Sequence, residues 1–159
     1  MMELDSPKDI RVKIMDYLAR RDHSKKEILK KMTSKVSSLE LLLTEIDKLE
    51  VEGYINEQRF AEDYVNARVF RGNGPLKIKA ELRNKGINDN VILAATLLHE
   101  ETWVINAHKA LVKKFGHINA ESYEEIQKLK LKKQRFLGSR GFSFEAINAA
   151  MKKDILIDN

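Results

Sequence analysis

The chain has 159 residues, enough for one ordinary domain or a short array of small units. Apolar residues make up 43% of it, and no segment alternates apolar and polar residues over the length of a strand, so we expect an all-α protein. The chain has no cysteine, which excludes disulfides and thiolate metal sites; it also shows no signal sequence or membrane-spanning segment, so we expect a cytoplasmic protein.

The first predicted unit, residues 1–53, contains three helices. The segment "IRVKIMDYLARR" has the apolar spacing of a helix with one buried face. Ser24 then begins a second helix, with Glu27 placed to complete a capping box. The third helix is expected from about Leu39 to Glu52, ending at Gly53.

The second predicted unit, residues 54–102, repeats this organisation. A helix over "NEQRFAEDYVNARVF" is interrupted by "RGNGP", where Pro75 suits the first position of the next helix because its missing N–H is not needed there. The segment "LKIKAELRNKG" follows, and a third helix is expected from Asp89 to about Thr102.

The third predicted unit, residues 103–159, begins with "WVINAHKALVKKF", closed by Gly116, and continues with "YEEIQKLKLKKQRFLGSRG" and "FEAINAAMKK". Three units of three helices predict nine helices in a tandem, elongated and curved array. We expect a monomer whose radius of gyration exceeds the roughly 15 Å of a compact chain of this length.

A short turn sequence recurs in all three units. The second copy, "LRNKGINDNVI" (82–92), matches the third, "LGSRGFSFEAI" (137–147), at an offset of 55 residues, and a more diverged first copy, "MTSKVSSLELL" (32–42), lies at an offset of 50. Such periodicity is typical of repeat proteins. Each copy has a base, which is Lys35, Lys85 or Arg140. The second and third copies follow it with a glycine, Gly86 or Gly141. All three copies then have a short polar residue, which is Ser38, Asn88 or Ser143.

These residues predict a helix end, a tight turn and a new helix. Glycine adopts the left-handed conformation at a helix C-terminus without penalty, and a short polar side chain caps the next helix. The first copy has Val36 at the glycine position, so its turn must differ.

Positive charge is segregated along the chain in step with the repeat. The net charge is +5; residues 11–35 hold nine bases and three acids, residues 68–87 six bases and one acid, and residues 128–140 six bases and no acid. Stacking the units would align these blocks in a basic stripe facing a polyanion or an acidic partner. The candidate contact residues are Lys25, Lys30, Lys35, Arg68, Arg71, Lys77, Lys79, Arg83, Lys85, Lys130, Lys132, Lys133 and Arg140.

No reactive constellation is apparent. The segment "HEETW" begins like the zinc motif H-E-x-x-H, but Trp103 stands where the second histidine would be. His99, His108 and His117 are spaced by nine, which does not place them on one helix face, so we expect them at the surface or at helix ends. We therefore expect no metal, no cofactor and no catalytic residue, and hence a protein that is not an enzyme.

Residues 53–87, "GYINEQRFAEDYVNARVFRGNGPLKIKAELRNKGI", resemble the signature of the RecX family of bacterial recombinase regulators. The matching positions are Gly53, Tyr54, Arg59, Phe60, Ala61, Tyr64, Arg68, Gly72, Gly74, Pro75, Ile78, Glu81, Leu82 and Gly86. Upstream, "YLARRDHSKKEILKKM" resembles the family's first unit at Leu18, Arg20, Arg21, Ser24 and Glu27. The resemblance covers most of the chain and weakens after Gly116.

This resemblance implies tandem three-helix repeats that lie in the groove of the RecA–single-stranded-DNA filament. It implies inhibition of the ATPase, strand-exchange and co-protease activities of RecA, without catalytic residues. The alternative is a direct, non-specific nucleic-acid-binding protein built of degenerate helix–turn–helix modules, with weak, sequence-independent contact to single- or double-stranded DNA. The helices after the three turns are apolar or acidic, which disfavours base readout.

Many signature residues also have a structural interpretation. Phe60, Tyr64, Ile78 and Leu82 fit core positions. Arg68 and Arg71 are better candidates for partner contacts, because guanidinium groups match carboxylates and phosphates.

Overall fold

The computed structural model describes residues 3–116 and 118–157. Over these ranges it contains nine α-helices and two short 3-10 helices, and the predicted all-α class is confirmed. In chain order they are α1 (Pro7–Arg20), α2 (Lys25–Met32), η1 (Thr33–Lys35), α3 (Leu39–Val51), α4 (Glu57–Phe70), α5 (Pro75–Asn84), α6 (Asp89–Leu97), η2 (Glu100–Thr102), α7 (Trp103–Phe115), α8 (Tyr123–Ser139) and α9 (Phe144–Ile157).

The helices begin where short polar side chains can accept from exposed backbone amides. Ser6, Ser24 and Ser122 each cap a helix in this way, and Ser24 forms the predicted capping box with Glu27. Pro75 occupies the first position of α5, as predicted.

The predicted extent of α6 was wrong. The helix ends at Leu97 rather than near Thr102. The amide of His99 donates to the Thr96 carbonyl at 3.1 Å and that of Thr102 to the His99 carbonyl at 2.9 Å, so the chain tightens into the 3-10 helix η2 before α7 begins.

The chain divides into two compact units. The N-terminal unit consists of Met1–Asp63 and Leu82–Ile92, and the C-terminal unit consists of Tyr64–Glu81 and Leu93–Asn159. Helices α4, α5 and α6 therefore each contribute residues to both units. The predicted division into three repeats at residues 53/54 and 102/103 stays a prediction.

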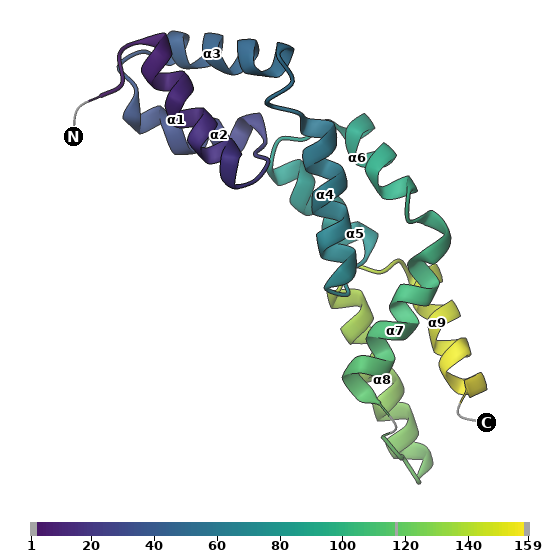
Figure 1. The fold of residues 1–159 in the computed structure, drawn as a ribbon. Coiled ribbons are helices and arrows are strands. Elements are labelled where there is room, and N and C mark those ends of the chain that lie inside the picture. The colour runs from purple at the N-terminus through teal and green to yellow at the C-terminus, as the bar shows by residue number, and fades with distance from the viewer. Residues whose placement is uncertain (1–2, 117, 158–159) are drawn as a thin grey trace. The chain divides into compact units, whose positions relative to one another are not determined.

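The core of the N-terminal unit is formed by α1, α2 and α3, which lie together (Figure 1). Ile10, Ile14, Ile28 and Leu42 are fully buried within it. An isolated parallel bridge between Leu4 and Val36 joins the start of the chain to the segment after η1.

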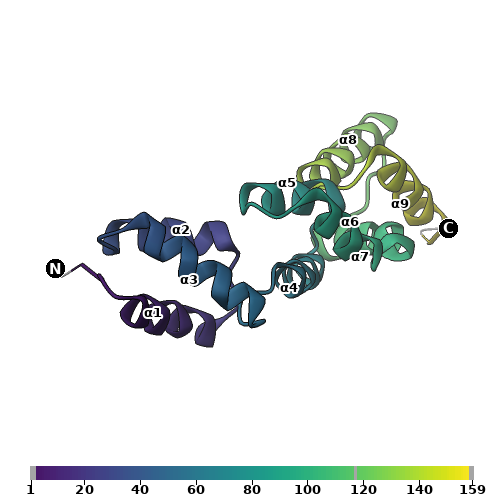
Figure 2. The same cartoon turned by 90° about the horizontal axis from the view of Figure 1, so that it is seen from above.

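The C-terminal unit is built around α7, α8 and α9, which pack on one another (Figure 2). Trp103, Leu111 and Leu137 are buried in this unit. The rings of Phe115 and Phe136 meet edge to face, with centroids 5.6 Å apart. Within the described ranges, every helix is too short or too polar to cross a membrane.

Candidate interaction surface

The second and third copies of the repeated turn each pack against the start of an earlier helix. Gly86 has φ of +79°, and a Cβ atom there would lie 2.9 Å from Cβ of Lys26 in α2. Gly141 has φ of +92°, and a Cβ atom there would lie 2.4 Å from Cβ and 2.5 Å from the backbone nitrogen of Lys77 in α5. Both positions thus need glycine for its conformation and for the close approach, and the predicted glycine turns are confirmed.

The first copy of the turn has a different geometry, as predicted. Val36 adopts extended angles, with φ of −110° and ψ of 149°, and its side chain is buried. It follows η1 and pairs with Leu4. A β-branched residue is suited to this extended position, where no left-handed turn is formed.

The three predicted N-caps after these turns are confirmed. The side-chain oxygen of Ser38 accepts from the Leu41 amide at 3.3 Å, and that of Ser143 from the Ala146 amide at 3.1 Å. Asn88 accepts from the Asn90 amide at 2.8 Å. Each cap satisfies one of the amides left open at a helix start.

The base shared by the three turns has a different environment in each copy. The Lys35 ammonium donates to the Tyr17 hydroxyl at 2.6 Å, and this hydrogen bond lowers the pKa of Tyr17. Lys85 donates to a carboxylate oxygen of Glu27 at 3.2 Å. The guanidinium carbon of Arg140 lies 5.2 Å from the centroid of the Phe136 ring, and Arg140 has no acidic partner among the described residues.

Glu27 links the capping box of α2 to the second turn. Its carboxylate accepts from both terminal nitrogens of Arg21 at 3.0 Å, from the Ser24 amide at 3.1 Å and from Lys85. Burial by itself would raise the pKa of Glu27, but these donors outweigh it and lower the pKa to about 2. Lys85 therefore has a structural role inside the N-terminal unit.

The third turn is held by backbone hydrogen bonds. The Gly74 amide donates to the Arg140 carbonyl at 2.6 Å, and the Leu76 amide donates to the Gly141 carbonyl at 2.9 Å. Open amides at the start of α5 are thus satisfied by carbonyls at the end of α8. Gly74 permits this approach, since a Cβ atom there would lie 2.5 Å from the Gly141 carbonyl carbon.

Arg68, a predicted partner contact, is engaged within the C-terminal unit. One of its terminal nitrogens lies 2.8 and 2.7 Å from the two carboxylate oxygens of Glu81, which also accepts from the Tyr64 hydroxyl at 2.7 Å. Burial would raise the pKa of Glu81, but the donors Tyr64 and Arg68 give a net lowering. This geometry gives Arg68 a role in joining α4 to α5.

The remaining candidate bases fall into two groups. Some are held by acids: Lys25 by Glu50 and Glu57, Arg83 by Asp89, and Lys133 by Asp154. The others show no ion pair within the described ranges, and these are Lys30, Arg71, Lys77, Lys79, Lys130 and Lys132. Their role in binding a partner stays a prediction.

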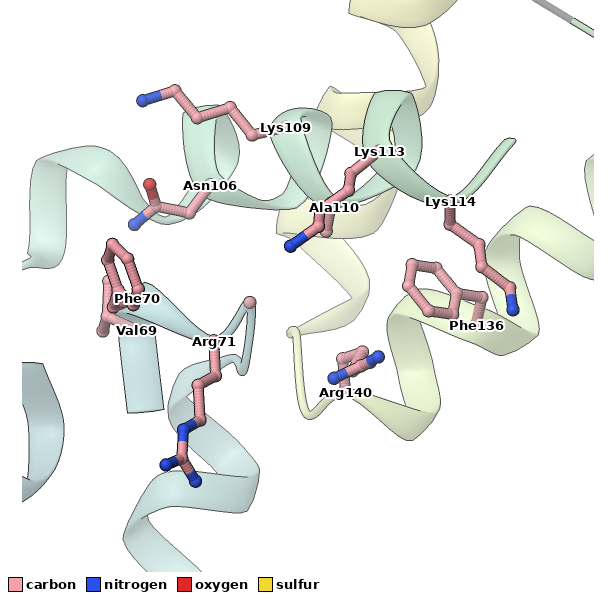
Figure 3. Close-up of a pocket in the computed structure, with 11 residues that line it drawn as sticks. Val69, Phe70, Arg71, Asn106, Lys109, Ala110, Lys113, Lys114, Phe136 and Arg140 are labelled. Carbon is pink, nitrogen blue, oxygen red and sulfur yellow. The ribbon is translucent and has the colours of Figure 1, made fainter. Parts of the chain in front are cut away.

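One cavity of the C-terminal unit has five bases and no acid among the described residues that line it (Figure 3). Its volume is about 310 Å³, and it lies between the end of α4, the face of α7 that carries Asn106 and Lys113, and the end of α8. Its bases are Arg71, Lys109, Lys113, Lys114 and Arg140, and its other lining residues are Val69, Phe70, Gly72, Asn106, Ala110 and Phe136. We call this site the cationic cavity.

Sequence reasoning found only two bases of the cationic cavity, Arg71 and Arg140. Lys113 and Lys114 were missed because they belong to an ordinary helix C-terminus, where lysine complements the helix dipole, and Lys109 was missed because a single lysine in the middle of a helix usually faces solvent. Phe70 was a possible indication of this site in the sequence, because it is a large apolar residue directly before Arg71 at a predicted helix end. In the structure Phe70 is 91% exposed.

The histidines are placed only partly as predicted. His99 lies next to η2 and its ring nitrogen is 2.7 Å from the side-chain oxygen of Asn66. The predicted surface or helix-end position of His108 was wrong. Its side chain is buried, because helical periodicity places this position on the inner face of α7. Its Nε2 atom lies 3.7 Å from Oδ1 of Asp154. His117 lies outside the described residues. The described part of the chain contains no group of acidic or histidine side chains able to hold a metal ion.

Comparison with known proteins gives a consistent result. Residues 56–95 match the second three-helix domain of RecX, and residues 105–151 match the third. The chain is 37% identical to "Regulatory protein RecX" of Legionella pneumophila (strain Corby), over 86% of this chain and 88% of the relative. It is 34% identical to the protein of the same name from Chromohalobacter salexigens, over 92% and 91% of the two chains.

The fold is similar to that of a solved protein of this kind. The crystal structure of RecX from Lactobacillus salivarius superposes with a TM-score of 0.79 and 25% identity, and covers 94% of this chain and 97% of that one. The superposed region, at 94% of this chain, is long enough to include the helices before and after the repeated turns.

Proposed function

We propose that this chain, which belongs to the RecX family of regulatory proteins, is a negative regulator of the RecA recombinase. It binds in the groove of the RecA–single-stranded-DNA filament and inhibits the ATPase, strand-exchange and co-protease activities of RecA. It acts by binding and not by catalysis. The observation that carries this proposal is the match to RecX relatives over nearly the whole chain.

The charge distribution supports a binding role. A filament of recombinase and DNA presents phosphates and acidic side chains, to which unpaired bases are attracted. Arg140 and the six candidate bases without an ion pair within the described ranges, Lys30, Arg71, Lys77, Lys79, Lys130 and Lys132, are therefore the proposed contacts. Bases already held by acids, such as Arg68 and Lys133, contribute mainly to the fold.

Weak contact with DNA accompanies this activity in our proposal. Contacts between lysine and phosphate are independent of sequence and weaken as salt rises, because they release counterions. The helices that follow the turns do not favour sequence-specific readout. The α6 segment "DNVILAATL", for example, has no basic side chain to reach a base edge.

Titration into a RecA ATPase assay on single-stranded DNA tests the proposal. We expect the ATPase rate to fall as the protein is added, and Arg140→Glu to weaken this inhibition. Arg135→Glu makes the same charge change at an exposed position of α8 outside the cationic cavity, so it is the matched control.

Two outcomes would contradict the proposal. An unchanged ATPase rate at saturating protein would exclude regulation of RecA. A sequence-specific footprint on duplex DNA at physiological salt would instead indicate a direct nucleic-acid-binding protein.

Sedimentation of the free protein tests the expected monomer.

A further inference from the structure

The cationic cavity has an aromatic surface that the fold does not use. Phe70, at the end of α4, is 91% exposed, so its ring adds little to the core. Phe136, on α8, is half-buried and carries the Arg140 guanidinium close to its ring. Flat aromatic faces of this kind can stack against another planar group.

The charge of the cavity is of one sign. Lys113 extends from α7 toward the turn that follows α4, Lys114 lies beside Phe136, and Arg140 lies at the end of α8 (Figure 3). Arg71 and Lys109 extend away from the centre of the cavity. Because none of the described residues that line the cavity carries a carboxylate, these bases are available to neutralise an anionic ligand.

A neutral polar group lies next to the exposed ring. The Asn106 carboxamide is beside Phe70 in Figure 3. Among the described residues, its nitrogen donates only to the Thr102 hydroxyl, at a long distance of 3.4 Å. A carboxamide offers both donors and an acceptor, which is the combination needed at the edge of a nucleobase.

We propose that the cationic cavity binds one nucleotide of a single-stranded nucleic acid. The base stacks on Phe70 with its edge toward Asn106, and the adjoining phosphates are neutralised by Lys113, Lys114 and Arg140. Base stacking on an aromatic side chain within a basic groove is a general mode of single-strand binding. The cavity, at about 310 Å³, is at the small end of the range of roughly 300–1,000 Å³ for ligand pockets, so a single nucleotide suits it.

This chemistry favours a single strand over a duplex and over an acidic peptide. The bases of a duplex are already stacked and paired, so an exposed phenylalanine has no base face to meet. An acidic peptide would use only the cations and would leave the exposed Phe70 ring without a planar partner. The inference rests on the proposed contact with nucleic acid and assigns that contact to a site.

The test measures binding of fluorescent oligothymidylate, and of a duplex of equal length, by anisotropy with no recombinase present. We expect Phe70→Ala and Phe70→Leu to weaken single-strand binding about tenfold, within the range for loss of one stacking side chain. Phe70→Tyr retains a ring and should bind like the wild type. Arg140→Gln should reduce the slope of log affinity against log salt by about 0.7, the value for one phosphate of a single strand.

Matched variants separate the cavity from its surroundings. Phe144→Ala removes another exposed phenylalanine of the C-terminal unit, and Arg135→Gln removes another exposed arginine of α8; both should bind like the wild type. Three results would each overturn the proposed site. The first is that Phe70→Ala binds the single strand with unchanged affinity, and the second is that the wild type binds the duplex equally well. The third is that polyglutamate competes as strongly as oligothymidylate. Absence of any single-strand binding by the wild type would overturn the proposed DNA contact itself, while the ATPase assay tests regulation of RecA separately.

Discussion

The second and third turns have the same sequence pattern but are held by different interactions. In the N-terminal unit, the second turn meets α2 through side chains, with the Lys85 ammonium donating to the partly buried carboxylate of Glu27. In the C-terminal unit, the third turn meets α5 through backbone hydrogen bonds, and the residue at the place of Glu27 is Lys77. Arg140 therefore has no acidic partner among the described residues, and it lines the cationic cavity instead.

This difference shows that a repeated motif can form the same backbone turn in each copy while the basic side chain beside the turn has a different function. Gly86 and Gly141 serve the same purpose in both units, whereas Lys85 is structural and Arg140 faces a cavity. Four predictions test the contrast, and each compares a change in one unit with a change in the other or with a matched control.

Substitution of the two turn glycines should produce the largest effects. Gly141→Ala combines a positive φ with a clash against the Lys77 backbone, and should lower the free energy of unfolding by about 3 kcal/mol. Gly86→Ala meets the side chain of Lys26 and should cost about 2 kcal/mol. Gly53 has φ of +85° with open space around it, so Gly53→Ala isolates the conformational cost of about 1 kcal/mol.

Urea denaturation followed by far-UV circular dichroism measures these three losses. Equal losses at Gly53 and Gly141 would show that the close approach to α5 adds nothing to the conformational effect.

The Glu27 network should make the N-terminal unit sensitive to acid. Because the folded state lowers the pKa of Glu27 from 4.5 to about 2, its contribution is fully present above pH 4.5 and is lost as the pH falls toward 2. A shift of this size corresponds to at most about 3 kcal/mol. In Glu27→Gln, this part of the acid destabilisation should be missing.

Chemical denaturation at a series of pH values measures the difference between wild type and Glu27→Gln. Glu40→Gln, at an exposed position of α3, is the control and should retain the wild-type acid dependence. Identical pH profiles for wild type and Glu27→Gln would refute the role assigned to the carboxylate.

Charge reversal at the equivalent bases should separate stability from binding. Lys85→Glu places a second carboxylate beside Glu27 and should destabilise the protein by about 2 kcal/mol. Arg140→Glu should cost less, about 1 kcal/mol, because it loses the contact with the Phe136 ring and the favourable charge at the helix C-terminus but breaks no ion pair in the described structure.

Thermal unfolding of both variants, alongside the ATPase assay, distinguishes the two roles. A stable Lys85→Glu variant together with an unstable Arg140→Glu variant would reverse the assignment.

The smallest effect is expected for the pair that joins α4 and α5. Arg68→Lys cannot reproduce the forked contact with Glu81 and should lower stability by about 1 kcal/mol. Arg71→Lys, at an exposed position nearby without an ion pair in the described ranges, should leave the free energy of unfolding unchanged. Equal unfolding midpoints for the two variants in urea would mean that the Arg68 contact is too solvent-screened to matter.

The local structure of this protein could be predicted from neighbouring residues alone. Helical periodicity, the caps at Ser24, Ser38, Asn88 and Ser143, and the glycine turns are decided by residues within four positions of one another, so they could be predicted. The extent of α6 could not, because its replacement by the 3-10 helix η2 before Trp103 has no comparable signal in the sequence.

Which bases are available to a partner depends instead on contacts between segments that are far apart in the sequence. Lys85 and Glu27 are 58 residues apart, and the sequence gives no indication that they meet. The cationic cavity likewise needs the ends of α4 and α8 to lie beside α7, which brings Phe70, Lys113 and Arg140 together. Ion pairs and cavities depend on contacts between distant segments, whereas caps and turns depend on the adjacent backbone, so the repeated motif revealed the fold but not the different roles of its basic residues.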